Sequence, residues 1–274
     1  MPWTEITRPQ YRREGLRYAS DVTDAEWRLI EPFMPRRHRL GRRRTVNLRE
    51  VVNAIFYLAT TGCQWRLLPR DFPPYTTVQG YFYEWLREGR LEVINHALVM
   101  ASREQQGRGA SPTAGIIDSQ SVKTTESGGP RGYDAGKKVK GRKRHILTDT
   151  AGHLVGLIVH IASIQDRDGA LAVLKSIRDL YPWLRHIFAD AGYAGAKLRE
   201  ALAELGEWTL EIIKRSDTAQ GFEVLPRRWV VERTLAWLGR CRRLAKDFEA
   251  STESSAAWTL VAHIRRLTRT LARA

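Results

Sequence analysis

The sequence lacks the features of exported and membrane-spanning proteins. Its 274 residues include only two cysteines, Cys63 and Cys241, which are far apart and fit neither a disulfide framework nor a zinc motif. We therefore expect two reduced, buried thiols. The longest apolar run, residues 154–162, is far shorter than the roughly 18 residues that span a bilayer, and Gly156 and His160 interrupt it. Residues 1–18 are polar and carry no apolar stretch of a secretory signal. These absences predict a location in the reducing cytoplasm.

Acidic residues are also scarce relative to basic ones. The chain has 45 Lys and Arg against 30 Asp and Glu, which gives a formal net charge of +15 and a pI near 10.2. Such an excess indicates a polyanionic partner, and without a membrane segment nucleic acid is the better candidate. The charge is concentrated in residues 36–49, 131–145 and 227–246, each with seven Lys or Arg. Protein surfaces usually mix charges of both signs, so these clusters predict contacts with phosphate.

The first part of the chain has the pattern of a small helical domain. Residues 23–26, Thr-Asp-Ala-Glu, form a capping box at the start of a helix. Apolar residues at helical spacing predict further helices over residues 48–60 and 77–87 and from residue 91 onward. We therefore divide the chain into an N-terminal arm (1–20), a helical domain (21–104), a linker (105–112) and a second domain (113–274).

The second part alternates strands with helices. We expect three strands, a helix, a strand, a helix, a strand and one long final helix from about residue 229. The strands are predicted at residues 113–117, 143–149, 154–160, 186–189 and 208–213, and the first two helices at 168–180 and 196–205. Alternation implies parallel pairing with right-handed crossovers, and the second and third strands form a hairpin. The expected fold is a mixed α/β sheet flanked by helices.

Three carboxylates stand out in this second part. Two apolar strands run directly into Asp118 and Asp190, and Glu232 lies alone among arginines. Ligands gather at the carboxyl ends of parallel strands. Magnesium binds through one or two carboxylates with water and phosphate, and two ions about 4 Å apart can clamp an in-line displacement. Taken singly, each acid has a simpler explanation, since a strand-end Asp often caps a helix or turn and Glu232 can pair with Arg228 or Arg233.

The motifs around these acids resemble those of a known family. The segments that carry the resemblance are Thr23–Trp27, Gly62–Pro69, Ile117–Lys123, Gly141–His145, Ala189–Tyr193 and Arg228–Thr234. Together they cover nearly the whole chain and resemble the DDE transposases of bacterial insertion sequences, specifically the fifth-numbered insertion-sequence family. One departure concerns the wider superfamily, which often has Tyr seven residues before the Glu and Lys seven after. Those positions hold Leu225 and Gly239 here, so Arg240, Arg242 or Trp237 would have to supply such a contact.

The resemblance implies an RNase H-like core, a catalytic triad of Asp118, Asp190 and Glu232, and two Mg²⁺ ions that the triad binds, with Mn²⁺ able to substitute. It implies strand cleavage by water at the end of the element, followed by attack of the new 3′ hydroxyl on target DNA. The partners would be double-stranded DNA of the element ends and of the target, bound by a homodimer on paired ends in the nucleoid of a bacterial cytoplasm. Two alternatives remain open: a non-catalytic DNA-binding protein derived from a transposase, and a stand-alone metal-dependent nuclease.

Several basic residues are candidates for DNA contact. We assign terminal-repeat recognition to the arginines of residues 36–49 and the helices around them. The candidates are Arg42, Arg43, Arg44, Lys123, Arg142, Lys143, Arg144, Arg228, Arg233 and Arg240. For residues 142–144 the alternative is that they decorate an exposed strand edge and prevent aggregation. His145 and Asp149 lie on the same predicted strand, and the sequence leaves their roles open between the site and ordinary packing.

Overall fold

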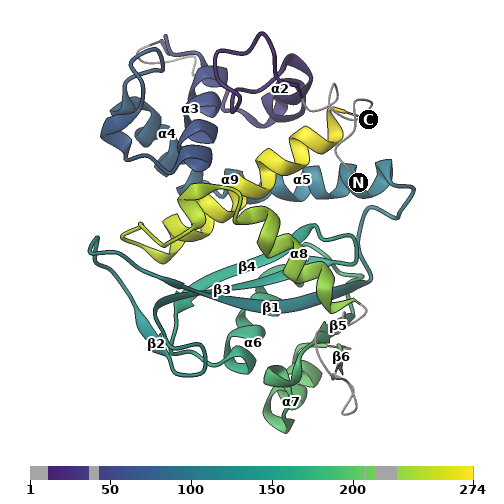
Figure 1. The fold of residues 1–274 in the computed structure, drawn as a ribbon. Helices are drawn as coiled ribbons and strands as arrows, with labels where there is room; N and C mark the ends of the chain where they lie inside the picture. Colours follow the sequence, from purple (N-terminus) through teal and green to yellow (C-terminus); the bar gives the residue numbers. More distant parts are fainter. Residues whose placement is uncertain (1–11, 37–42, 207, 214–226, 274) are drawn as a thin grey trace.

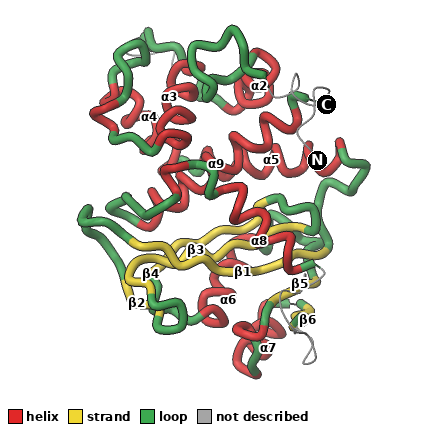
Figure 2. Tube along the Cα trace, in the orientation of Figure 1, coloured by secondary structure: helices red, strands yellow, loops and turns green. Residues whose placement is uncertain are grey.

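A six-stranded mixed sheet with helices on both faces organises the molecule (Figures 1 and 2). The computed structural model describes residues 12–36, 43–206, 208–213 and 227–273. The strands are β1 (Ala114–Lys123), β2 (Gly132–Asp134), β3 (Val139–Asp149), β4 (Leu154–Ile161), β5 (His186–Ala189) and β6 (Thr209–Ile212). The helices are α2 (Asp24–Ile30), α3 (Leu48–Thr61), α4 (Tyr75–Arg87), α5 (Arg90–Gln105), α6 (Asp166–Ile177), α7 (Ala196–Leu205), α8 (Arg228–Leu238) and α9 (Thr252–Leu271).

The sheet combines antiparallel and parallel pairing. Its order is β2-β3-β1-β5-β6, in which β1 is antiparallel to β3 and parallel to β5, and β5 is parallel to β6. Strand β4 shares the outer edge of β3 with β2, because β2 pairs with residues 139–141 and β4 with residues 142–148. Helices α6 and α7 lie on one face, whereas α8, α9 and the N-terminal helices lie on the other (Figure 1). The predicted fold class is confirmed, with β2 as an additional strand.

Local sequence signals fix most element boundaries. The capping box at α2 is present, with Thr23 Oγ1 accepting from the Glu26 amide at 3.2 Å. Helix α3 ends at Gly62, whose φ of 70° is the left-handed conformation that glycine adopts readily. A side chain at Gly62 would also meet the backbone of Arg242 at 3.1 Å, so the end of α3 packs closely against the turn that precedes α9.

The expectation of one long final helix is wrong. Helix α8 ends at Leu238, a turn of 3₁₀ helix follows over residues 242–244, and α9 starts only at Thr252. The intervening segment is tied to the sheet, since the Asp247 amide donates to the Lys123 carbonyl at 2.8 Å. The hydroxyl of Ser251 then caps α9 by accepting from the Ser254 amide at 3.1 Å.

Helix α9 packs among the N-terminal helices and not only on the sheet. It contacts α2, α3, α4 and α5 on one side and β4 on the other. At its centre, His263 Nδ1 lies 2.6 Å from Asn95 Oδ1, and the Leu154 amide lies 3.1 Å from His263 Nε2. Burial lowers the pKa of His263 well below its usual value, so the ring is neutral and can accept from that amide. A single buried apolar cluster therefore contains residues from both the predicted helical and catalytic regions.

Two further expectations can be compared with the structure. Both thiols are free; Cys241 is buried, whereas Cys63 is only half-buried. Within the described part of the chain, no helix is both long and apolar enough to cross a membrane.

Candidate active site

Asp118 lies in the middle of a strand and not at its end, so the expected strand boundary is wrong. Parallel pairing of β1 with β5 covers residues 114–116, but β1 continues to Lys123 because β3 pairs with it as far as Gly141. Side chains alternate between the two faces of a strand. Ser119 faces α6, where its hydroxyl donates to Asp166 at 2.8 Å, so Asp118 faces α8. The carboxylate therefore lies just beyond the parallel part of the sheet.

Asp190 directly follows β5, as predicted. Its Oδ1 accepts from the Gly192 amide at 2.8 Å and caps the short 3₁₀ helix Ala191–Tyr193. The carboxylate is thus a cap, but its side chain remains 30% exposed and has a second neighbour. Arg228 Nη2 of helix α8 lies 3.7 Å from Asp190 Oδ2.

Glu232 lies one turn after Arg228 on α8. Arg228 Nη2 lies 3.4 Å from Glu232 Oε1, so one guanidinium group is within 4 Å of both Asp190 and Glu232. The Glu232 side chain is 52% exposed, which leaves its carboxylate accessible from solvent. The ion pair that offered the simpler explanation of Glu232 is therefore present, and it joins two of the three acids.

The electrostatics of Asp118 connect it to the same cluster. Burial raises its pKa to about 6, the Ser119 amide opposes this shift by donating to it at 2.7 Å, and the charge of Asp190 raises the pKa further. The nearby cations Lys137 and Arg228 act in the opposite direction. The three acids lie on β1, after β5 and on α8, and Arg228 is an electrostatic neighbour of each of them.

The chemistry of these donors fits a divalent cation. Carboxylate oxygens are the ligands that Mg²⁺ takes from proteins, and the negative charge of Asp190, which raises the pKa of Asp118, is one that a cation would offset. Among the described residues, no group of three or more acids, histidines or cysteines is already arranged to hold an ion. In this arrangement the positive charge next to Asp190 and Glu232 comes from Arg228.

Sequence reasoning missed several polar neighbours of the site. Asp166, at the start of α6, accepts from Ser119 and also from Lys143 Nζ at 2.8 Å. Lys137 Nζ donates to the Ser119 carbonyl at 2.9 Å. The hydroxyl of Tyr193 is buried, and burial together with three nearby carboxylates raises its pKa well above 10. An acid in the first turn of a helix ordinarily interacts with the helix dipole, so nothing in the local sequence distinguishes Asp166.

Residues 142–144 are not on a surface. Arg142, Lys143 and Arg144 are 0%, 4% and 3% exposed, because β3 lies between β1 and the edge shared by β2 and β4. Arg142 and Arg144 point toward the 239–251 segment, where Arg144 donates to the Leu244 carbonyl at 2.9 Å, whereas Lys143 points toward α6. Both sequence-based interpretations, phosphate tracking and edge protection, assumed exposed side chains, and that assumption is wrong.

The other predicted DNA contacts divide into exposed and engaged side chains. Lys123, Arg43 and Arg240 are exposed, and Arg42 lies outside the described residues. Arg44 is half-buried and donates to the Pro35 carbonyl at 2.8 Å.

Helix α8 carries one more of these arginines. The guanidinium of Arg233 stacks on both Trp229 and Trp237, at 4.3 and 4.4 Å from their ring centres, and donates to the Ala151 carbonyl at 2.9 Å. The guanidinium of Arg266 also lies 3.7 Å from the ring centre of Trp237. The Trp237 ring, a candidate for stacking on DNA, therefore already has two cationic neighbours.

His145 and Asp149 have structural partners. Burial lowers the pKa of His145 to about 3, and its Nδ1 lies 2.7 Å from His160 Nε2. Asp149 is fully buried at the β3–β4 turn, where it accepts from the amides of Ala151 and His153. Its contact with Arg103 fastens α5 to this turn. Asp149 therefore organises the hairpin.

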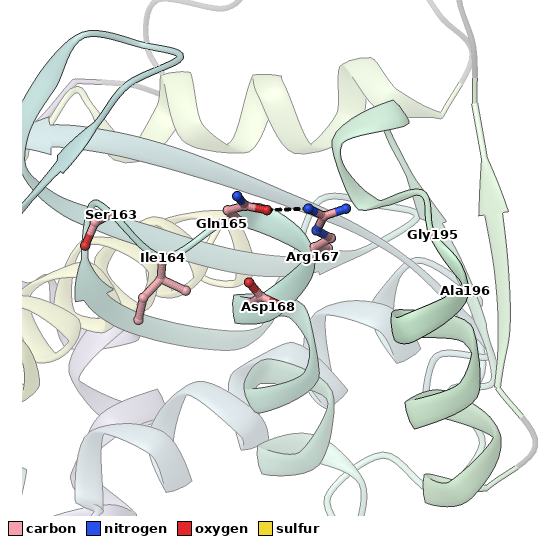
Figure 3. Close-up of a pocket in the computed structure, with 7 residues that line it drawn as sticks. All are labelled: Ser163, Ile164, Gln165, Arg167, Asp168, Gly195 and Ala196. Carbon is pink, nitrogen blue, oxygen red and sulfur yellow. Dashed lines mark hydrogen bonds between the residues drawn. The ribbon is translucent and has the colours of Figure 1, made fainter.

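A separate pocket lies beside the site. It has a volume of about 710 Å³ and lies where α6 and α7 begin (Figure 3). Its lining includes Gln165 and Arg167, which hydrogen bond to each other at 2.6 Å. None of the three acids lines it, so its size does not make it the reaction centre.

Comparison with known proteins identifies the family. Residues 109–267 match the family described as "Transposase DDE domain", and residues 22–95 match "Putative transposase of IS4/5 family". The putative transposase for insertion sequence element IS402 of Burkholderia cepacia is 31% identical over 150 residues, which are 52% of this chain and 69% of that protein. Protein y4sN of Sinorhizobium fredii is 30% identical over 83 residues, 30% of this chain and 64% of that protein. No solved structure matches the chain.

The first of these matches covers more than half of the chain and includes all three acids. The resemblance seen in the sequence motifs is therefore confirmed, and the family implies DNA as the partner and a divalent metal as the usual cofactor. The chain belongs to the DDE transposases of insertion sequences.

Proposed function

We propose that this protein binds the ends of an insertion sequence and catalyses metal-dependent DNA strand cleavage and strand transfer at Asp118, Asp190 and Glu232. The observation that carries the proposal is the position of Arg228, which lies within 4 Å of both Asp190 and Glu232. In addition, the charge of Asp190 raises the pKa of Asp118. Arg228 thus links acids from separate segments, and the side chains of Asp190 and Glu232 are 30% and 52% exposed. Family membership supplies the reaction class.

In this proposal the three carboxylates hold two Mg²⁺ ions, for which Mn²⁺ can substitute. The ions when bound would activate the attacking oxygen and stabilise the leaving oxygen of an in-line phosphoryl displacement. The protein contributes rigid placement, since Asp118 is held within a strand and Asp190 is held by the Gly192 amide. Arg228 supplies a positive charge at the position where a substrate phosphate would approach.

The same site would act twice. Water would first attack the phosphodiester at the element end, which breaks the bond to the flanking strand and leaves a 3′ hydroxyl. That hydroxyl would then attack a phosphodiester of target DNA, which joins the element to the target and releases a new 3′ hydroxyl there. Both steps exchange one phosphate ester bond for another bond to the same phosphorus.

The N-terminal helices are our candidate for recognition of the terminal repeats. The exposed Arg43 lies just before α3, which makes it a suitable contact for DNA. Deleting residues 1–105 would be a poor test, because α9 would lose the helices against which it packs. Arg43→Ala is sharper, and unchanged end-specific footprinting by this variant would exclude this residue from recognition. A homodimer on paired ends is also part of the proposal, and sedimentation with and without DNA ends tests it.

A joining assay separates this function from its two alternatives. Purified protein is incubated with Mg²⁺, labelled DNA that carries candidate ends, and a target plasmid. Joined product supports a transposase, binding without reaction supports a non-catalytic DNA-binding protein, and nicks alone support a nuclease. Asp118→Asn and Glu232→Gln should lose joining while keeping the fold and DNA binding. Joining by either variant would overturn the assignment.

A further inference from the structure

A basic groove lies at the far end of β1 from the parallel strands. Five cationic side chains and one aromatic side chain line it: Lys123, Arg131, Lys138, Lys140, Lys246 and Tyr133. They come from the end of β1, the segment around β2, the start of β3 and the turn before α9. The groove shares no lining residue with the pocket at the starts of α6 and α7, although Ser163 of that pocket lies against Gly132 of β2.

The backbone around this groove, which we call the β1-end groove, is held firmly. Lys123 and the segment before α9 are joined by two hydrogen bonds, from the Asp247 amide to the Lys123 carbonyl at 2.8 Å and from the Thr125 amide to the Asp247 carbonyl at 3.1 Å. The buried guanidinium of Arg142 then donates to the carbonyls of Pro130 and Ala250, at 2.8 and 3.2 Å. Lys123, Arg131 and Lys246 are therefore fixed relative to one another by the protein interior.

The cations of the groove are available to a ligand. All five are exposed, and none forms an ion pair with a carboxylate in the part of the chain that the structure describes. Glu126 is the one acid among the lining residues. Lys138 is held with a φ of 53° at the turn between β2 and β3, a conformation that residues other than glycine rarely adopt. Five unpaired cations so close together repel one another, so a polyanion that neutralises them would bind favourably.

The groove suits nucleic acid better than an acidic protein. Tyr133 is 55% exposed among the cations, and an exposed aromatic ring within a basic groove offers a face for a base or a sugar. Lysine and arginine contacts with phosphate fix the position of DNA without reading its sequence. Lys140 points to the same face of β3 as Arg142 and Arg144, but it lies at the start of the strand and stays exposed, as does Lys138 in the turn before it.

We propose that the β1-end groove binds the phosphodiester backbone of double-stranded DNA about five base pairs from the reacting phosphate. The spacing follows from β1 itself, because Asp118 and Lys123 are five residues apart on one strand, or about 17 Å. Phosphates of one DNA strand are about 3.4 Å apart along the axis. The distance of five base pairs from the reacting phosphate rests on the proposed function, whereas the binding of DNA to the groove does not.

Charge removal in the groove tests this proposal. The variant Lys138→Gln/Lys140→Gln is compared with a control, Lys175→Gln/Arg178→Gln, which removes two exposed charges from α6 and the residue after it. Affinity for a 30-base-pair duplex is measured by fluorescence anisotropy between about 50 and 200 mM salt. The groove variant should lose about two units of the slope of log affinity against log salt, and the control should not. Equal effects of the two variants would mean that only net charge matters and would overturn the proposal.

Further experiments locate the bound DNA and distinguish element-end DNA from target DNA. Element-end duplex and unrelated duplex should weaken together, because the contacts are with phosphate; an effect on one alone would assign the groove to element-end or to target DNA. Hydroxyl-radical footprinting of the Asp118→Asn protein should show protection about five base pairs from the cleavage position, lost in the groove variant. If the variant instead lost binding to polyglutamate but not to DNA, the groove would be a protein-docking site.

The outcomes for the groove and for the proposed function are distinguishable. A groove variant with a reduced salt slope, in a protein that joins no DNA, would support the groove and contradict the transposase reaction. Joining activity of the protein, together with an unchanged salt slope in the groove variant, would support the transposase reaction and contradict the groove.

Discussion

Replacement of Arg142 tests whether the basic cluster of residues 131–145 is divided between structure and DNA contact. The Arg142 side chain is fully buried, and its guanidinium lies 3.1 Å from Asp247 Oδ1, itself fully buried. It also donates to four backbone carbonyls, those of Pro130, Glu249, Ala250 and Ser251. Arg142→Met would keep much of the apolar volume and leave these acceptors and the Asp247 carboxylate without their donor.

The expected cost follows from the loss of one partner of a buried ion pair. Such a loss costs about 3–5 kcal/mol, because the remaining charge stays buried and uncompensated. That is a large fraction of the roughly 5–15 kcal/mol by which folded proteins are stable. For a chain of this size it corresponds to a melting temperature lower by at least about 6 °C.

Urea denaturation followed by circular dichroism measures this cost. Lys140→Met, two residues earlier on the same strand but exposed, is the matched control and should change the unfolding free energy by less than about 0.5 kcal/mol. For DNA binding we expect the opposite contrast. Lys140→Met should lower the affinity for DNA although the protein remains fully folded. If Arg142→Met were as stable as the wild type and bound DNA more weakly, the reasoning would be refuted, and Arg142 would be an exposed DNA contact.

Three other predictions concern the site and its surroundings. Arg228→Gln should bind Mn²⁺ about fivefold more tightly in calorimetry, since one charge about 4 Å away changes the interaction by about 1 kcal/mol even in water; weaker binding would contradict competition between Arg228 and the ion. Lys137→Met should raise the pKa of Asp118 above about 6, because Lys137 lowers it, and the acid limb of the cleavage rate should move to higher pH; an unchanged limb would exclude Lys137. Burial lowers the pKa of His145 to about 3, below its unfolded value of about 6.5, so its contribution to stability is present above about pH 6.5 and is lost as the pH falls toward 3. His145→Gln should lose less stability than wild type between pH 7.5 and 5, and equal losses would contradict this.

The parts of the fold with strong local signals could be predicted from the sequence. Helix α7 and strand β5 have the predicted limits, because Gly206 stops the former and the latter is a short apolar run. The position of Asp190 after β5 followed directly. The boundaries that failed depend on partners distant in sequence. Residues 119–123 have the polar composition of a loop, but β3 pairs with them and extends β1.

The division of the basic cluster is likewise a tertiary property. The carboxylate that pairs with Arg142 is 105 residues away, and Asp166, which pairs with Lys143, is 23 residues away. Without those partners, the sequence shows only seven cations in fifteen residues, which is typical of a DNA-binding surface. The break between α8 and α9 has the same origin, since Asp247 and Glu249 turn inward to meet Arg142 and Arg243.

Iron-directed cleavage tests most directly whether Asp118, Asp190 and Glu232 form one metal-binding site. Fe²⁺ is bound in place of Mg²⁺, and ascorbate with hydrogen peroxide generates radicals that cut the backbone near the ion. We predict cuts close to residues 118, 190 and 232 together, suppressed by excess Mg²⁺ and absent from Asp118→Ala. Cuts near only one of these residues, or at another part of the chain, would contradict a shared site.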